Sequence, residues 1–293
     1  MAAIQLGAQG PPVLAIQNAL IAGGYLAGPV DGLFGPITQA ALIAFQKSKK
    51  LAPDGILGPD TKAALFPLSG DITAFPRGID VSHYQGTVNW AQVSAAGFSF
   101  VYAKTTESSQ SVDPSFQQNW SALKNGPLLR GAYHYFDTAA PAASQADFFC
   151  KTLGALAATD LPPMLDFEAA GQDSLTPAQR AGAALAWMQS VASSLGRKPI
   201  LYTNSDFFED GAGDSLLLAG YEIWMAQYPA DGPQTRYAAS TPPPSVPVRL
   251  PSAWTQWNFW QYTGQGVIPG AFNGENLVDF DVFQGSLKAL AGL

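Results

Sequence analysis

Eight short apolar or β-branched runs divide most of the chain into regular segments. They lie at 78–82, 98–104, 129–136, 163–168, 199–204, 222–228, 257–262 and 277–281. Helical patterns such as WAQVSAAG and PAQRAGAALAWMQSVASSLG separate the first five runs, and this alternation predicts a parallel sheet with helices outside it. Eight strands favour closure into a barrel. Because the last runs lack clear helices between them, we expect an α/β fold with an irregular barrel.

An internal repeat marks a different kind of region at the N-terminus. The segment DGLFGPITQAAL at 31–42 is echoed by DGILGPDTKAAL at 54–65. In each copy Asp-Gly predicts a turn, and Thr38 or Thr61 is expected to cap the helix that follows. An amphipathic pattern at 14–21 predicts a further helix ahead of the repeats. The sequence therefore predicts a small helical bundle.

These patterns divide the chain into parts. We expect a small all-α domain at 1–67, a linker at 68–76 and the barrel at 77–293. The prolines and glycines of FPLSGDITAFPRG are typical of a linker. Residues 229–256 are rich in Pro, Ser and Thr and predict a long loop, which could be a lid or a passive insertion.

Composition narrows the classes of partner and chemistry. The formal net charge of -7 argues against nucleic acid or an anionic membrane, since both bind clustered Lys and Arg. One cysteine and two histidines supply too few ligands for a typical zinc site, so we expect no metal and no cofactor. No run approaches about 18 apolar residues, so no transmembrane helix is expected. The opening MAAIQLGAQGPPVLAIQ has no basic region followed by a long apolar run, so no signal peptide is expected.

Carboxylates follow several of the predicted strands. Asp80 lies near the end of the first, Asp166 and Glu168 end the fourth, and Asp279 and Asp281 end the eighth. Active sites of parallel barrels lie at the carboxyl ends of the strands, so these acids are expected at one rim. In a strand, the two acids of PPMLDFE point to the same face and repel each other.

Several carboxylates without a metal fit the hydrolysis of glycosides. One group must hold a proton for the leaving oxygen, and the repulsion within PPMLDFE is useful if it keeps a proton on Glu168. Each acid alone has a structural alternative: Asp80 could cap a helix, and Asp279 could pair with Arg77 or Lys104.

A sugar also needs a surface of aromatic and amide side chains at the same rim. The candidate substrate-binding residues near strand ends are Tyr133, Tyr135, Tyr202, Gln227 and Trp260. About half of the aromatics near the rim are expected to be core instead, because aromatics often fill barrel interiors. His134 alternates away from Tyr133 and Tyr135, so we expect it to be structural rather than a base.

The barrel segment resembles the glycoside hydrolase family 25 muramidases, which are lysozymes of phages, bacteria and fungi. The stretches that carry the resemblance occur in order: GIDVSHYQG, FVYAKTTES with VDPSF, GAYHYF, PPMLDFE, ILYTN, IWMAQY, WQYTGQG and VDFDVF. The resemblance implies a barrel of five β/α units plus three strands. It also implies Glu168 as general acid/base, Asp166 as its partner, and Asp80 and Asp279 as supporting acids, with Asp281 at a more variable position.

The N-terminal repeats resemble the three-helix peptidoglycan-binding domain of wall hydrolases. Together the resemblances imply a monomeric, endolysin-like muramidase that cleaves the β-1,4 bond between N-acetylmuramic acid and N-acetylglucosamine in peptidoglycan. The apparent lack of a leader fits a phage lysin made in the host cytoplasm and released through a pore, or a secreted protein whose leader has been removed. Two alternatives are a non-catalytic wall-binding barrel and a chitinase-like enzyme. Removing residues 1–70 is expected to weaken wall binding and to leave activity on soluble fragments.

Overall fold

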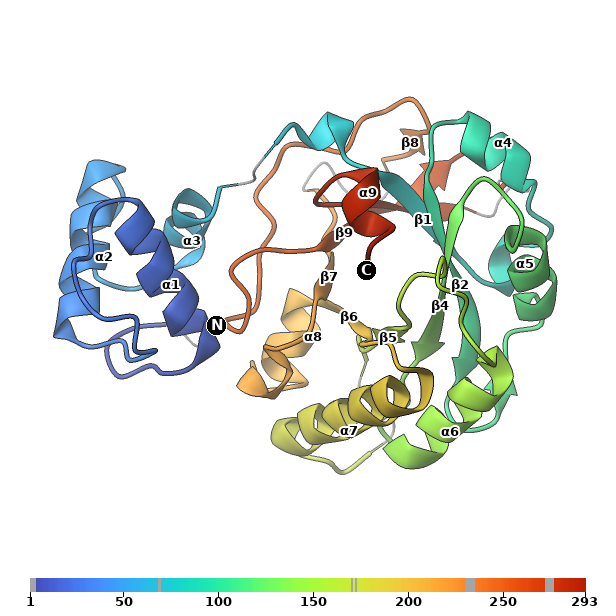
Figure 1. Cartoon of the computed structure of the whole chain (residues 1–293), viewed down its shortest axis with the longest axis horizontal. Coiled ribbons are helices and arrows are strands. Elements are labelled where there is room, and N and C mark those ends of the chain that lie inside the picture. Colours follow the sequence, from blue (N-terminus) through green and yellow to red (C-terminus); the bar gives the residue numbers. More distant parts are fainter. Residues whose placement is uncertain (1–3, 68–69, 170, 172, 230–234, 272–276) are drawn as a thin grey trace.

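The computed structural model describes residues 4–67, 70–169, 171, 173–229, 235–271 and 277–293, and it places a helical N-terminal region beside a barrel (Figure 1). The N-terminal region contains α1 (Pro11–Ala22), α2 (Pro36–Ser48) and α3 (Pro59–Leu65). These helices share a core of their own, which includes Ile16, Leu20 and Phe45. Within the described residues, no helix has both the length and the apolar character needed to cross a membrane.

A buried glutamine closes each N-terminal repeat. Gln17 Nε2 donates to Asp31 Oδ1 at 2.8 Å and to Thr38 Oγ1 at 3.2 Å. In the second repeat Gln46 makes the matching bonds at 2.8 and 3.1 Å. Thr38 is not the helix cap that we predicted, because α2 already begins at Pro36. Its hydroxyl instead receives the glutamine amide that ties the turn to the helix.

Eight strands close the barrel in chain order. They are β1 (Arg77–Val81), β2 (Phe100–Glu107), β4 (Leu129–Tyr135), β5 (Met164–Asp166), β6 (Ile200–Asn204), β7 (Ile223–Ala226), β9 (Phe259–Val267) and β10 (Val278–Phe283). Neighbours pair in parallel from β1 through β9, whereas β10 is antiparallel to both β9 and β1. Two short strands, β3 (Ser111–Val112) and β8 (Tyr237–Ala238), pair with β2 and β9. The predicted irregular α/β barrel is confirmed.

Helices follow the first five barrel strands and cover the outside of the barrel (Figure 1). They are α4 (Trp90–Ala95), α5 (Phe116–Leu123), α6 (Ala142–Leu153), α7 (Pro177–Leu195) and α8 (Ser205–Asp210). At the end of the chain α9 (Leu287–Leu290) packs its Leu290 against the barrel interior, together with Phe283 of β10. The short helices η1 (Ile72–Ala74), η2 (His83–Gln85) and η3 (Leu216–Leu218) lie in the connections.

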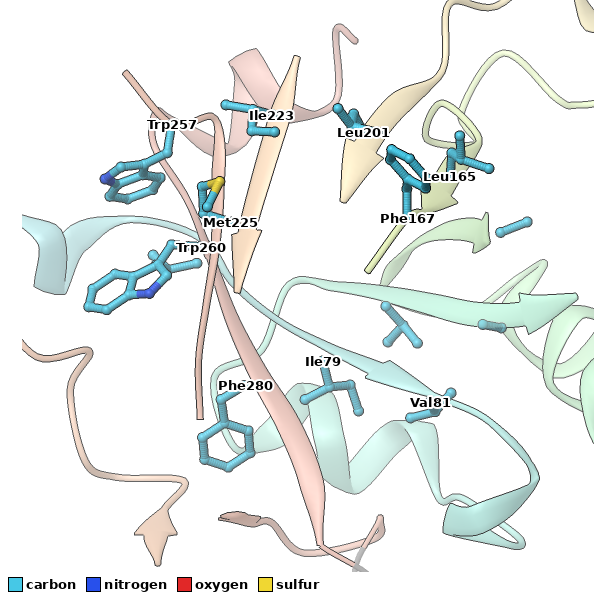
Figure 2. Packing of buried hydrophobic residues seen from close by; sticks show 14 of the residues in the cluster. Ile79, Val81, Leu165, Phe167, Leu201, Ile223, Met225, Trp257, Trp260 and Phe280 are labelled. Atoms are coloured by element: carbon cyan, nitrogen blue, oxygen red, sulfur yellow. The ribbon is translucent and has the colours of Figure 1, made fainter. Parts of the chain in front are cut away.

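Side chains along the strands alternate between the barrel interior and an outer layer under the helices. The interior cluster includes Phe100, Tyr102 and Trp224. Ile79 and Val81 belong to the outer cluster (Figure 2), so Asp80 between them points into the barrel. The same alternation decides which of the predicted site residues can meet.

The segment predicted as a linker is in part an element of the barrel. Residues 72–74 form η1, whose first residue, Ile72, is buried in the outer cluster of the barrel together with Phe75. Asp71 caps this helix by accepting from Thr73 N at 3.0 Å. Residues 68–69 lie outside the described part of the chain.

Candidate active site

Four carboxylates from three strands gather at the rim where the parallel strands end. Asp80 lies on β1, Asp166 ends β5, and Glu168 follows two residues later. Asp279 is paired in register directly opposite Asp80. Asp80 and Asp166 are buried, whereas Glu168 and Asp279 are half-buried. The structure therefore brings these four acids to one rim, as predicted, although only Asp80, Asp166 and Glu168 reach it near or after the end of a strand.

Asp279 reaches this rim by a route that differs from our prediction. We expected it at the end of an eighth parallel strand, but β10 runs antiparallel, so Asp279 lies near its beginning. The start of an antiparallel strand lies at the same rim as the ends of its parallel neighbours. Asp281 lies two residues deeper, opposite Gly78, and is fully buried. The expectation that Asp281 ends a strand at the rim is therefore wrong.

The structural alternatives for these acids are not observed. The cap of η2 is Ser82, which accepts from Tyr84 N, and not Asp80. Lys104 pairs with Glu107 at 2.6 Å. Arg77 donates to the carbonyl oxygen of Ala239 at 2.6 Å, so neither cation is committed to Asp279.

Burial raises the pKa of every acid in the group. It raises the pKa of Asp166 well above its usual range, and the charges of Glu168 and Asp80 add to this shift. Burial raises the pKa of Asp80 to about 6 against the opposing hydrogen bond from Gln261. It also raises the pKa of Glu168, while the Tyr202 hydroxyl opposes the shift. Burial is thus the main cause for Glu168, and the repulsion that we expected there acts mainly on Asp166.

Gln261 is a central residue of the site that we did not predict. Its Nε2 donates to Asp80 Oδ2 at 2.8 Å. Its Oε1 accepts from the hydroxyls of Tyr202 at 3.0 Å and Tyr228 at 2.8 Å. A side-chain amide has a donor nitrogen and an acceptor oxygen, so these three bonds fix the orientation of the Gln261 amide. Its nitrogen therefore faces the Asp80 carboxylate.

Trp260 does not belong to the site. It is fully buried in the outer layer (Figure 2), and its Nε1 donates to the carbonyl oxygen of Gln227 at 2.8 Å. A side chain on that face cannot stack on a sugar at the rim, so the prediction for Trp260 is wrong. The alternation of side chains along WQY could have predicted this. If Trp260 points outward, Gln261 points into the barrel.

The three predicted tyrosines lie on inward positions of β4 and β6. Tyr133 is buried in the interior cluster, and Tyr202 joins the Gln261 network. Tyr135 is half-buried, and Lys104 Nζ lies 4.9 Å from its ring centroid. His134 faces the other way, with Thr106 Oγ1 2.8 Å from Nδ1 and Gln145 Oε1 3.0 Å from Nε2, which agrees with the structural role that we predicted.

A pocket of about 740 Å³ opens beside Glu168. We call it the acid-lined pocket. Its other walls come from the end of β6 and the start of α8, from the end of β7 and the three residues that follow it, and from Val246, Pro247 and Arg249. Gln227 lines it, but its side chain is already engaged: Oε1 accepts from Arg249 N at 2.6 Å, and Nε2 donates to Pro247 O at 2.9 Å. Among the described residues, no three His, Cys, Asp or Glu side chains are grouped so that they could hold a metal ion.

A closed barrel with four carboxylates gathered at one rim, one of which, Glu168, lines a pocket, is the arrangement of a glycoside hydrolase. The family model described as "Glycosyl hydrolases family 25" matches residues 79–271, which is more than half of the chain. The chain therefore belongs to glycosyl hydrolase family 25, and the resemblance seen in the sequence is confirmed. A second family model, described as "Putative peptidoglycan binding domain", matches residues 9–65.

The chain is also similar to proteins from several bacteria. The uncharacterized protein YegX of Escherichia coli K12 is 32% identical over 222 residues, which cover 73% of this chain and 71% of YegX. Lysozyme M1 of Streptomyces globisporus is 29% identical over 229 residues, covering 75% of this chain and 72% of that protein. The structure is similar to the crystal structure of a bacterial lysozyme from Streptomyces coelicolor, with a TM-score of 0.65 and 30% identity, covering 75% of this chain and 97% of that one.

Proposed function

We propose that this protein is a muramidase that hydrolyses the β-1,4 bond between N-acetylmuramic acid and N-acetylglucosamine in bacterial peptidoglycan. The observation that carries the proposal is the meeting of Asp80, Asp166, Glu168 and Asp279 at one rim of a family 25 barrel. The match of the N-terminal region to a peptidoglycan-binding domain supports the choice of polymer. The lysozyme names of two similar proteins support the reaction.

Glu168 is our candidate general acid/base. It lines the acid-lined pocket, and burial raises its pKa, which favours the protonated form that a general acid needs. It donates this proton to the oxygen of the leaving sugar as the glycosidic bond breaks. The resulting carboxylate then takes a proton from the attacking water, which restores the acid.

Asp166 is our candidate for orienting the substrate. Its Oδ1 is buried and has no hydrogen-bond partner among the described residues. The N–H of the 2-acetamido group of N-acetylmuramic acid would satisfy this acceptor. The acetamido oxygen is then held under the anomeric carbon, attacks it as the glycosidic bond breaks, and is displaced by water. A covalent adduct between Asp166 and the sugar would contradict this route.

The supporting residues hold the acids in place. Gln261 donates to Asp80 and thereby orients its carboxyl group, and Tyr202 and Tyr228 hold Gln261 from its other side. We further propose that the N-terminal region holds the wall while the barrel cleaves it, in a monomeric protein of the endolysin type. Joining two weak contacts with one insoluble polymer raises the effective concentration of each site.

The test is the release of new reducing ends from purified bacterial cell walls. We expect the wild-type protein to release muramic-acid reducing ends, and Glu168→Gln to lose at least about a hundredfold in kcat, the contribution typical of general acid/base catalysis. Glu222→Gln is the matched control, because Glu222 is also half-buried but precedes β7 at the opposite end of the barrel. Wild-type protein that binds walls and releases no reducing ends would refute the proposal. Release from chitin oligomers but not from walls would favour a chitinase-like enzyme.

A further inference from the structure

One segment of the long loop lies between the N-terminal region and the acid-lined pocket. We call residues 245–252 the strap. Its residues Val246, Pro247 and Arg249 line the acid-lined pocket. The strap also lines a second pocket of about 500 Å³, whose opposite wall is α3 with the residues that flank it. In Figure 1 this orange stretch passes between the N-terminal helices and the barrel.

A buried lysine joins α3 to the strap. Lys62 is 7% exposed, and its Nζ donates to the carbonyl oxygens of Leu250 at 3.2 Å and Pro251 at 3.1 Å. Lysine is almost never fully buried unless it is paired, so this contact is specific. Burial lowers the pKa of Lys62 to about 8, and the charges of Asp214 and Glu209 oppose this shift.

The same strap is tied to the wall of the acid-lined pocket. Arg249 N donates to Gln227 Oε1 at 2.6 Å, and Gln227 Nε2 donates to Pro247 O at 2.9 Å. The carbonyl oxygen of Arg249 accepts from Ser205 Oγ at 2.8 Å. The Arg249 guanidinium forms an ion pair with Asp206 of α8, with 2.8 Å between Nη1 and Oδ1. The conformation of the strap therefore sets where this wall of the pocket stands.

The strap has no secondary structure of its own. No helix or strand is assigned to residues 245–252, so its order depends on the packing of Val246, Val248 and Leu250 against the outer cluster and on bonds such as those above. Leu250 and Pro251 are buried, and loss of the Lys62 ammonium would leave their carbonyl oxygens without this donor. Leaving buried acceptors unsatisfied is costly, so the strap would move to find water.

We propose that α3 docks on the strap through Lys62 and thereby positions one wall of the acid-lined pocket. The N-terminal region then shapes the substrate site in addition to binding the wall. Lys62 is a positioning residue in this scheme, because it acts through the strap and does not reach the acids. The substrate part of this inference rests on the proposed muramidase function, whereas the docking itself does not.

The experiment compares Lys62→Met with Lys47→Met in the full chain. Lys47 is exposed on α2, so its variant loses the same charge from the same region without touching the strap. The first readout is hydrogen exchange in peptides that cover residues 245–256, which include the bonded amides of Arg249 and Ser252. We expect exchange there to rise at least about tenfold in Lys62→Met, because local opening becomes easier. We expect no change in Lys47→Met and partial protection in Lys62→Arg, which keeps a donor.

The second readout is the kinetics on soluble peptidoglycan fragments, which require no anchoring to the wall. We expect KM to rise about fivefold in Lys62→Met with kcat nearly unchanged, because the pocket wall moves while Glu168 and Asp166 stay in place. Thermal unfolding of all three variants identifies any general loss of folding, and Lys62→Arg keeps the test valid if Lys62→Met does not fold.

Each outcome decides a different part of the inference. Unchanged exchange over 245–256 in Lys62→Met overturns the docking. Faster exchange with an unchanged KM shows that the strap does not set the substrate site, and this overturns the positioning role. If wild-type protein releases no reducing ends from walls or fragments, the proposed function fails, and the substrate part of this inference fails with it. The exchange measurement still decides the docking.

Discussion

Asp80 lies among the other carboxylates of the rim, and this environment opposes its ionisation. It is buried, it faces Asp279 across the strand pair, and the charge of Glu168 adds to the effect of burial. The Gln261 amide offsets part of this cost by donating to its carboxylate. A residue that is selected only for stability would not be an aspartate here, and such local cost is typical of functional sites.

Replacing Asp80 by Asn should therefore stabilise the protein at neutral pH. The pKa of Asp80 is raised from 3.8 to about 6 in the folded protein, so the folded state binds this proton more tightly than the unfolded state. In the wild-type protein, the contribution of this proton to the free energy of unfolding is fully present below about pH 4 and is lost as the pH rises through about 6. At pH 7 we expect Asp80→Asn to be more stable by up to about 3 kcal/mol, with the advantage gone at pH 4.

Urea unfolding at pH 4 and pH 7 measures this difference. The exposed Asp147→Asn is the control, because it removes a carboxylate far from the charged group. An Asp80→Asn protein whose stability changes with pH in the same way as wild type would show that Asp80 does not titrate as described. We also expect this variant to lose activity, as is common when a strained site is relaxed.

At the scale of elements, the sequence predicted the positions of the strands but not all of their directions. The apolar runs identify all eight barrel strands to within a few residues, because a strand buried between helices and a filled interior must be apolar. A run of apolar residues carries no information about direction, and β10 was wrongly taken as parallel. The length of the connection was the missed signal: Val267 ends β9 and Val278 begins β10, and this gap is too short for a helical crossover.

The same limit applies to the candidate site. The acids were predictable because a carboxylate after an apolar run is conspicuous in a chain with few charges. Gln261 was not predicted, because it lies inside a run of aromatics whose inward members are set by the register of β9. The contact of Lys62 with the strap joins segments far apart in the chain, and no local pattern in the sequence specifies such a pair.

The inner packing of the barrel gives a prediction at this scale. Gly78 lies on β1, where an added Cβ would lie 2.1 Å from the ring of Phe100, which is fully buried in the interior. We expect Gly78→Ala to destabilise the protein by about 3 kcal/mol, since overpacking a filled core forces other side chains to move. Gly182→Ala is the control, because Gly182 lies within α7 with open space around its Cβ position. We expect the control to stabilise by about 0.5–1 kcal/mol, and chemical unfolding that ranks the two variants the other way would contradict the packing described here.

At the scale of the whole molecule, the two regions are joined by more than a linker. Ile72 and Phe75 anchor the connection in the barrel, and Lys62 fixes α3 to the strap. From the sequence alone, removal of residues 1–70 was expected to leave activity on soluble fragments unchanged. Docking through Lys62 implies instead that removal of the N-terminal region affects both the grip on the wall and the shape of the acid-lined pocket.

A truncated protein that lacks residues 1–67 but keeps Ile72 and Phe75 separates these two effects. We expect the truncated protein to bind walls at least about tenfold more weakly, because one of two linked contacts is gone. On soluble fragments we expect its KM to rise by the same factor as in Lys62→Met, because both proteins lack the support of the strap. Lys62→Met should still sediment with walls as wild type does, since its N-terminal core remains intact.

Sedimentation with purified walls and kinetics on soluble fragments, measured on all three proteins, check this pattern. Undiminished sedimentation of the truncated protein would refute the wall-binding role, and an unchanged KM would show that the regions act independently after all.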